Sequence, residues 1–214
     1  MNKFATLEHI HRHLVIGVVR ESSASRALSN ARAYVSGGVA ALEISSACPK
    51  SGEIIGALKE QYGDQVAVGA GTVLDNVTAR IMMLAGADFI AAPSFSQPVA
   101  EMCHLYQTFY MPACYTSNEI AEILKSGLSV VKLFPGDLYT PATVRVMKNM
   151  YEGLEVIAAG GVNEENLTQW LDLGVWALGL ALPGLPAAEI TEKSRSFIAL
   201  LKKSADRALA ARGA

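Results

Sequence analysis

Two ionisable residues stand inside runs of apolar residues, where a charge is costly to bury. Glu43 lies in "ALEISS" (residues 41–46) and Lys132 lies in "VVKLFP" (residues 130–135). A buried charge needs a partner or a shifted pKa. One interpretation is an ion pair that only fills the interior, although such pairs add little net stability compared with apolar packing. The other interpretation is a reactive pair.

A lysine in a dry environment can lose its proton near neutral pH, and the neutral amine then attacks a ketone to form a Schiff base. The protonated imine draws electrons from the neighbouring carbon. A carboxylate such as that of Glu43 could carry protons there, directly or through a water molecule. Together Glu43 and Lys132 predict a metal-free aldolase or dehydratase, and the pair alone does not choose between the two.

The two residues belong to a regular alternation of short apolar runs and amphipathic segments. The amphipathic segments carry apolar residues three and four positions apart and often end in glycine, as helices do. Eight such units predict an α/β protein with a (β/α)8 barrel, forming one domain over residues 1–214. We expect an extra helix at about 3–12 and a long closing helix at about 186–211. The expected strands are 14–19, 41–46, 66–71, 89–93, 110–115, 130–135, 155–161 and 176–182.

An open, doubly wound sheet is the alternative fold. It usually shows a glycine-rich dinucleotide motif after an early strand, and "GVVRES" after the first run lacks that motif. In a barrel of parallel strands the reacting groups lie at the C-terminal ends of the strands. This rule places Glu43 and Lys132 on the active face, together with Arg20, Thr72 and Pro93, and favours the reactive pair over the structural one.

Composition excludes several classes of partner. The formal net charge is −2 and no basic block occurs, so we expect neither a nucleic acid nor a membrane surface as partner. No apolar run is long enough for a spanning helix, and the N-terminal residues lack the apolar segment of a signal peptide. The three cysteines are widely spaced without a CxxC pair, which predicts reduced thiols and a cytoplasmic location.

The histidines do not predict a metal site. His9, His11 and His13 alternate in "HIHRH", and residues two apart do not share a helix face. His104 falls in a helical segment, where a surface or packing role is expected. No DxD or HExxH pattern lies at a strand end, so we expect chemistry without a metal or other cofactor.

The stretch "AAGGVNEEN" places Gly160 and Gly161 directly after the seventh strand. Glycines here let backbone N–H groups approach an anion, and barrels commonly bind phosphate after strands seven and eight. The alternative is a tight turn that needs positive φ angles. We expect a helix capped by Asn163, with Glu164 and Glu165 in its first turn, and these carboxylates would partly oppose an anion.

These residues resemble a known family. The stretches "GGVAALEIS", "VGAGTVLD", "FIAAPSFSQPV", "VVKLFPGD" and "AAGGVNEEN" occur in the order and spacing of the 2-keto-3-deoxy-6-phosphogluconate (KDPG) / 4-hydroxy-2-oxoglutarate (KHG) aldolase family, over about residues 15–182. The resemblance implies a class I aldolase, usually a homotrimer, that reversibly cleaves a 2-keto-4-hydroxy acid to pyruvate and an aldehyde. The combination of "GAGTVL" and "VKLFP" makes it specific.

The resemblance also implies roles for single residues. The family's Schiff-base lysine matches Lys132, and its general acid/base glutamate matches Glu43. The residues that line its pyruvate pocket match Thr72, Pro93 and Phe134, and an arginine after the first strand matches Arg20. Arg20 or Thr72 could hold the substrate carboxylate. Arg20 as a surface residue and Phe134 as a core residue are the alternatives.

Three departures from the family pattern lie at the presumed phosphate end. Ala47 stands where the family often has arginine, Ala159 where many members have threonine, and Leu180 and Ala181 where a Gly-Gly-Ser or Gly-Gly-Asn pattern is common. Each change removes a polar group or a glycine, which suggests a non-phosphorylated aldehyde partner or another keto acid. The alternatives are a related Schiff-base lyase or hydratase and a ligand-binding barrel without catalysis.

Overall fold

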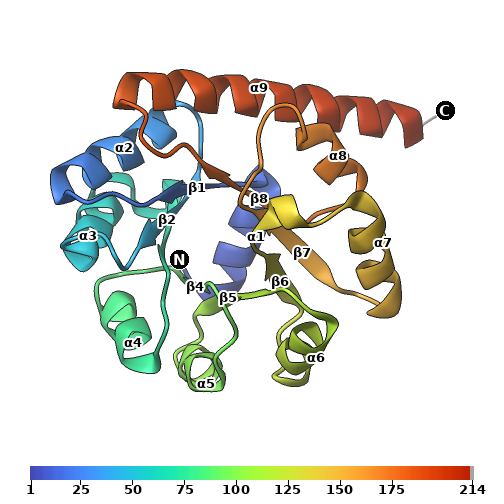
Figure 1. Cartoon of the computed structure of the whole chain (residues 1–214). Coiled ribbons are helices and arrows are strands. Elements are labelled where there is room, and N and C mark those ends of the chain that lie inside the picture. The colour runs from blue at the N-terminus through green and yellow to red at the C-terminus, as the bar shows by residue number, and fades with distance from the viewer. Residues whose placement is uncertain (213–214) are drawn as a thin grey trace.

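The computed structural model describes the backbone of residues 1–212 and the side chains of residues 1–204, and its strands form a closed barrel. Each strand pairs in parallel with the next, and β8 closes onto β1 through the register of Val15 with Leu178. Figure 1 looks along the barrel, with helices α2 to α9 around its outside. The strands are β1 (Val15–Val19), β2 (Ala41–Ser45), β3 (Ala67–Gly71), β4 (Phe89–Ala92), β5 (Phe109–Cys114), β6 (Val130–Leu133), β7 (Glu155–Ala159) and β8 (Ala177–Ala181).

Helices alternate with these strands, and most begin at a side chain that accepts a hydrogen bond from the first turn. Ser23, Asp75 and Thr140 do so for α2, α4 and α7, while Thr116 and Glu119 form a capping box at α6. The helices are α1 (Lys3–His13), α2 (Ala24–Ser36), α3 (Ser51–Tyr62), α4 (Asn76–Leu84), α5 (Gln97–Leu105), α6 (Ser117–Lys125), α7 (Pro141–Met150), α8 (Leu167–Asp172) and α9 (Ala187–Arg212). Short 3-10 turns follow α3 and β6, at η1 (Gly63–Gln65) and η2 (Gly136–Leu138).

The (β/α)8 barrel predicted from the alternating pattern is confirmed, and every expected strand is present within two residues of its predicted ends. The extra helix expected at about 3–12 is α1, and the closing helix expected at about 186–211 is α9. The helix expected directly after Asn163 is wrong in its position. Residues 164–166 form a turn, and α8 begins only at Leu167.

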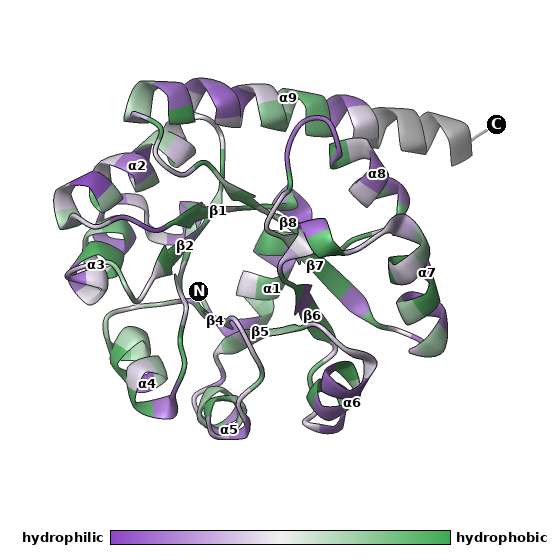
Figure 2. Cartoon of the chain, viewed as in Figure 1, coloured by the Kyte–Doolittle hydropathy of each residue, from purple (hydrophilic) through white to green (hydrophobic). Residues whose placement is uncertain are grey.

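Two layers of apolar side chains hold the barrel together. One layer fills the space between strands and outer helices and includes Leu42 and Ile44 of β2, whose side chains point outward. The other fills the interior and includes Ala41 of the same strand, with Phe89 and Ile157. Strands buried on both sides are apolar along their length, as the green strands of Figure 2 show, whereas the helices alternate green and purple. A charged residue on an inward position is therefore exceptional.

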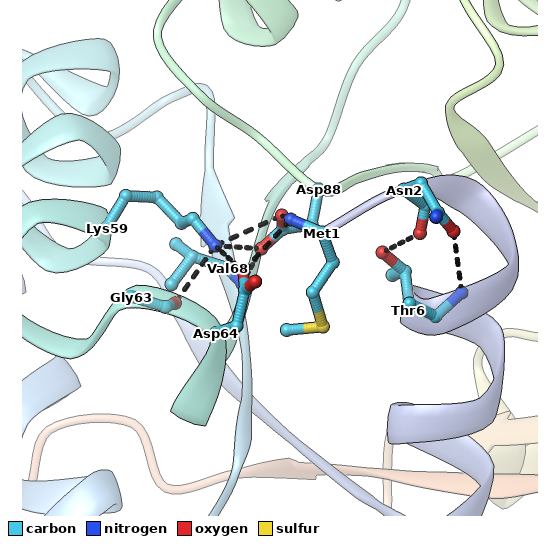
Figure 3. A network of polar contacts seen from close by, with 9 residues as sticks. Met1, Asn2, Thr6, Lys59, Gly63, Asp64, Val68 and Asp88 are labelled. Atoms are coloured by element: carbon cyan, nitrogen blue, oxygen red, sulfur yellow. Dashed lines mark hydrogen bonds and ion pairs between the residues drawn. The ribbon is translucent and has the colours of Figure 1, made fainter.

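Helix α1 covers the end of the barrel at which the strands begin, behind the strands in Figure 1. Its Ile10 is fully buried in the interior layer. Figure 3 shows the polar contacts beside it, where the Asp88 carboxylate accepts from Lys59 Nζ at 2.9 Å and from Val68 N at 2.9 Å. The ammonium of Met1 also donates to Asp88, at 2.6 Å. These contacts join α1, α3, β3 and β4 at this end.

None of the helices in the described residues is long and apolar enough to cross a membrane. All three cysteines, Cys48, Cys103 and Cys114, are free and buried. Burial raises the pKa of the Cys103 thiol and of the Cys114 thiol to about 12. These two side chains therefore act as apolar packing groups rather than nucleophiles.

Candidate active site

Glu43 and Lys132 meet inside the barrel. Lys132 Nζ lies 2.9 Å from Glu43 Oε2 and 3.1 Å from Oε1, although the two residues are 89 positions apart. Their side chains are 8% and 9% exposed. Both point inward from strands β2 and β6, above the apolar interior layer. The closed barrel thus turns two isolated charges of the sequence into one buried pair with a proton acceptor beside an amine.

Glycines of β3 make room for the side chains of Glu43 and Phe89. A Cβ atom on Gly71 would overlap the carboxylate of Glu43, and one on Gly69 would overlap the ring of Phe89. Residues Glu43 and Gly69 are register partners in the β2–β3 ladder, so the carboxylate extends along the neighbouring strand. Gly71 is therefore a steric requirement for placing Glu43 beside Lys132, whereas Gly69 makes room for Phe89.

A pair of hydroxyl groups lies next to this site. Ser45 Oγ and Thr72 Oγ1 are 2.9 Å apart, and Ser46 Oγ donates to the carbonyl oxygen of Thr72 at 2.8 Å. Thr72 has a φ of 57°, which is rare for a β-branched residue. Such a conformation costs roughly 1–3 kcal/mol and persists where the surroundings hold it. The two Ser–Thr contacts hold Thr72 with its hydroxyl at the cavity.

The pair lies in a cavity of about 260 Å³ at the C-terminal ends of the strands. One side of the cavity is formed by residues on or directly after β2, β3, β4, β6 and β7. The other side is formed by residues on or directly after β1 and β8 and by residues of α2 and α9. Its lining comprises Val18, Val19, Arg20, Glu21, Asn30, Tyr34, Glu43, Ser45, Thr72, Ala92, Pro93, Lys132, Phe134, Ala159, Gly160, Ala181, Leu182, Pro183 and Ile190. The volume suits a small molecule.

Phe134 and Gly160 form the wall beside the lysine. The Phe134 ring centroid is 5.6 Å from Lys132 Nζ, and the side chain is 41% exposed, so Phe134 faces the cavity and not the core. Gly160 has a φ of 82°, and a Cβ there would stand 3.3 Å from the Phe134 ring. Gly161 lies outside the cavity, where its Cβ would be 2.6 Å from Asp137 Cβ. Of the two glycines, Gly160 alone borders the site.

Comparison with known proteins agrees with this geometry. The family model for KDPG and KHG aldolase matches residues 7–184. The chain belongs to the KDPG and KHG aldolase family. The 2-dehydro-3-deoxy-6-phosphogalactonate aldolase of Escherichia coli K12 is 29% identical over 191 residues, which is 89% of this chain and 93% of that protein. The 2-dehydro-3-deoxy-phosphogluconate aldolase of Treponema pallidum is 31% identical over 165 residues, covering 77% of this chain and 78% of the relative.

A solved structure described as native KDPGal superposes with a TM-score of 0.83 at 27% identity, covering 90% of this chain and 96% of that one. The barrel described above is thus the fold of this aldolase family. The residues that the sequence motifs single out mostly converge on one cavity, since Arg20, Glu43, Thr72, Pro93, Lys132, Phe134 and Gly160 all line it.

The sequence missed three polar residues of this aldolase cavity. Tyr34 lies on α2 and is 2% exposed, and its hydroxyl accepts from Leu182 N at 2.8 Å. Burial raises the pKa of Tyr34 above its ordinary value, so the hydroxyl keeps its proton. Asn30 lies one turn before it, 5% exposed, and its Nδ2 donates to Glu21 Oε1 at 2.7 Å. Glu21 follows the end of β1, so the rule that reacting groups lie at the C-terminal ends of strands could have found it. Asn30 and Tyr34 lie within α2, and no sequence pattern indicated a role for them.

The loop after β7 differs from the expected helix start. Asn163 Oδ1 accepts from Glu165 N at 2.9 Å and Asn166 N at 3.1 Å, so Asn163 caps a turn rather than α8. The helix that follows is only six residues long, and its first turn holds no acidic residue. Glu164 and Glu165 therefore lie in the turn, exposed at the end of the barrel where β7 and β8 finish.

Proposed function

We propose that this protein is a class I aldolase, in which Lys132 forms a Schiff base with the ketone of a 2-keto-4-hydroxy acid. The observation that carries this proposal is the buried Lys132–Glu43 pair, with Nζ 2.9 Å from a carboxylate oxygen, on the floor of a small-molecule cavity. A pair that only filled the interior would not need to border a cavity. Membership of an aldolase family supports the same chemistry.

In the proposed cycle the Lys132 amine attacks C2 of the substrate, and loss of water gives the imine. Glu43 takes the proton of the C4 hydroxyl as the C3–C4 bond breaks, and the aldehyde leaves. The electrons of that bond pass into an enamine. Glu43 or a water returns a proton to C3, and hydrolysis releases pyruvate and the lysine. The same steps in reverse join pyruvate to an aldehyde.

The surrounding residues have positioning roles in this proposal. Thr72, supported by Ser45, donates a hydrogen bond to the substrate carboxylate, and Arg20 supplies a positive charge at the cavity mouth. Pro93 and Phe134 form apolar walls that exclude water from the amine. Gly160 leaves space beside the Phe134 ring for the substrate chain. No metal or organic cofactor is required by these steps.

Borohydride trapping tests the role of the lysine. The protein is incubated with pyruvate, reduced with borohydride and weighed by mass spectrometry. We expect one added reduced pyruvate in the native protein and none in Lys132→Ala. Exposed Lys50 provides the matched control, and Lys50→Ala should trap pyruvate like the native protein. An adduct that survives Lys132→Ala would overturn the proposal.

The substrate is proposed only as a class. KDPG, 4-hydroxy-2-oxoglutarate and non-phosphorylated analogues share the 2-keto-4-hydroxy acid that the Lys132–Glu43 pair acts upon. The two relatives named above are phosphogalactonate and phosphogluconate aldolases. The kcat/KM for pyruvate release from each compound ranks them as substrates. If none of these compounds released pyruvate, the aldolase activity would be refuted. A pyruvate adduct at Lys132 without aldol cleavage would then indicate the related lyase or hydratase chemistry.

We further propose a homotrimer, as is usual in the family, located in the cytoplasm. An apolar stripe on and before α4 supports association, because Leu74, Val77, Ile81 and Leu84 are each more than half exposed. Light scattering after size exclusion should give three times the chain mass. Ile81→Glu should lower that mass, whereas Val146→Glu on α7 should not. A monomeric native protein would contradict the trimer.

A further inference from the structure

The cavity has a far side, opposite Lys132, that the proposed steps at the ketone do not use. It is lined by residues at the end of β1, on α2, after β8 and on α9. Leu182, Pro183 and Ile190 make it partly apolar, and Glu21, Asn30 and Tyr34 make it polar. In a substrate bound to Lys132 through C2, the aldehyde-derived half points away from the pyruvate half, so this side is where its tail would lie.

Glu21 is held in one orientation on this far side. Its Oε1 accepts from Asn30 Nδ2 at 2.7 Å, and its backbone N–H donates to Cys48 Sγ at 3.2 Å. Arg26 Nε stands 3.3 Å from the other carboxylate oxygen, but Arg26 is 54% exposed and lies outside the cavity. The Glu21 side chain itself is only 11% exposed. A carboxylate fixed in this way is a preorganised acceptor.

Asn30 adds a second acceptor. Its side chain is buried at 5% exposure, and within the described side chains its Oδ1 has no hydrogen-bond donor. Carboxylate and amide oxygens accept hydrogen bonds from hydroxyl groups and repel or fail to bind a phosphate. Arg20 also lines the cavity, but its side chain is exposed and its charge is screened by water, whereas Glu21 is shielded.

The loop after β7 does not compensate for this acidic far side. Barrels commonly bind phosphate through backbone N–H groups after strands seven and eight. Here the N–H groups of Asn163, Glu165 and Asn166 already donate to side chains of the same turn. Glu164 and Glu165, together with Lys193, also line a second hollow that shares Ala181 and Leu182 with the main cavity. These three N–H groups of the turn are therefore already engaged, and two carboxylates border the second hollow.

We infer that Glu21, positioned by Asn30, is a specificity residue that selects an uncharged, hydroxylated tail and disfavours a phosphorylated one. The inference rests on the proposed aldolase function. A hydroxyl group of the tail would donate to Glu21 or to Asn30 Oδ1, and the apolar side chains would cover its carbon atoms. A phosphate in the same place would face the shielded carboxylate of Glu21, and apart from Lys132 the only cation of the described cavity lining, Arg20, is exposed and screened by water.

The test compares 2-keto-3-deoxygluconate with its 6-phosphate. The native protein should show a higher kcat/KM for the non-phosphorylated acid, by about tenfold or more. Glu21→Gln keeps the shape and the acceptor for Asn30 but removes the charge. It should shift the preference toward the phosphate by about tenfold. Glu21→Asp retains the charge and should keep the native order of preference.

Glu53→Gln is the matched control, because it removes the same charge from an exposed side chain in the first turn of α3. It should leave the ratio of the two substrates unchanged. Gluconate and 6-phosphogluconate, which lack the ketone, provide a binding readout by calorimetry that needs no turnover. Glu21→Gln should strengthen binding of 6-phosphogluconate relative to gluconate.

The outcomes separate this inference from the proposed function. Absence of a pyruvate adduct at Lys132 would refute the aldolase proposal. The ratio of the affinities for 6-phosphogluconate and gluconate, measured by calorimetry, would still test the role of Glu21. A native preference for the 6-phosphate would overturn the specificity role even if no Glu21 variant folded. The specificity role is also overturned if Glu21→Gln and Glu53→Gln change the ratio equally, or if neither changes it in catalysis or binding.

Discussion

At the scale of single residues, the site depends on two charged side chains, each of which would be costly to bury without the other. Glu43 and Lys132 each interrupt an apolar strand, and the barrel places them 2.9 Å apart at less than a tenth exposure. The sequence predicted both residues and their chemistry from residue type alone. It missed the glycine that admits Glu43, because a missing Cβ shows its purpose only when the neighbouring strand is known.

Glu43→Gln tests the proton-transfer role. The amide can still accept a hydrogen bond from Lys132 but cannot take up a proton, so we expect turnover to fall by about a hundredfold or more. Pyruvate trapping at Lys132 should remain detectable, since the amine is retained. Glu53→Gln on the surface serves as the control. Turnover of Glu43→Gln within about threefold of the native rate would contradict the role.

Gly71→Ala tests the steric requirement. The added Cβ would overlap the Glu43 carboxylate, so the carboxylate must move away from Lys132 and kcat should fall by about a hundredfold. Gly56→Ala is the matched control, because its Cβ would meet nothing closer than the Ala85 carbonyl oxygen at 3.7 Å. Steady-state rates on one keto acid compare the two. Equal rates in both variants would show that Glu43 tolerates the displacement.

At the scale of elements, α1 closes the end of the barrel away from the site, and two of its histidines contact carbonyl oxygens directly before strands. His9 Nε2 donates to the Ala40 carbonyl oxygen at 2.9 Å, and its ring lies 4.5 Å from that of His13. The alternate spacing predicted that these histidines would not form a metal site on a helix. They do lie on a helix, and each of them contacts a backbone carbonyl oxygen.

Stability should depend on pH through His9. Burial lowers the pKa of His9, and the nearby charges of His13 and Arg12 act in the same direction, while the bond to Ala40 and the carboxylate of Asp88 oppose them. The unfolded chain binds this proton near its ordinary pKa of 6.5 and the folded chain binds it only at lower pH. Stability from this group is therefore complete above that pH and is lost as the pH falls through the folded pKa.

Urea unfolding at about pH 7.5 and about pH 5.5 measures the effect. His9→Gln can still donate to Ala40 but does not titrate, so its stability should fall less between the two pH values than that of the native protein. His104→Gln, on α5, should behave like the native protein. An equal loss in all three proteins would exclude His9 as the source.

At the scale of the whole molecule, the buried polar contacts that stabilise the barrel and the cavity of the candidate site lie at opposite ends. The contacts around Asp88 in Figure 3 join α1, α3, β3 and β4 where the strands begin, whereas the cavity opens where they end. Conservative changes at the first end should therefore alter folding without altering catalysis, as is general for barrels of this kind.

Asp88→Asn tests this separation. The Asp88 side chain is 3% exposed, and removing its charge leaves Lys59 without a buried partner. The free energy of unfolding should fall by about 3 kcal/mol, with kcat unchanged. Asp64→Asn is the matched control, because Asp64 contacts the same two cations but is 75% exposed. Urea unfolding should show a much smaller loss for Asp64→Asn. A similar loss in both would contradict the argument from burial.

The sequence by itself determined the barrel, because alternating apolar runs and amphipathic segments are local patterns that each strand and helix carries separately. It also singled out Glu43 and Lys132, because a charge within an apolar strand stands out without any partner. Tertiary structure alone brought Asn30 and Tyr34 to the cavity and excluded Gly161 from it. Those placements depend on how β8 closes onto β1 and how α2 packs against β1 and β2, and no local pattern encodes a contact between distant segments.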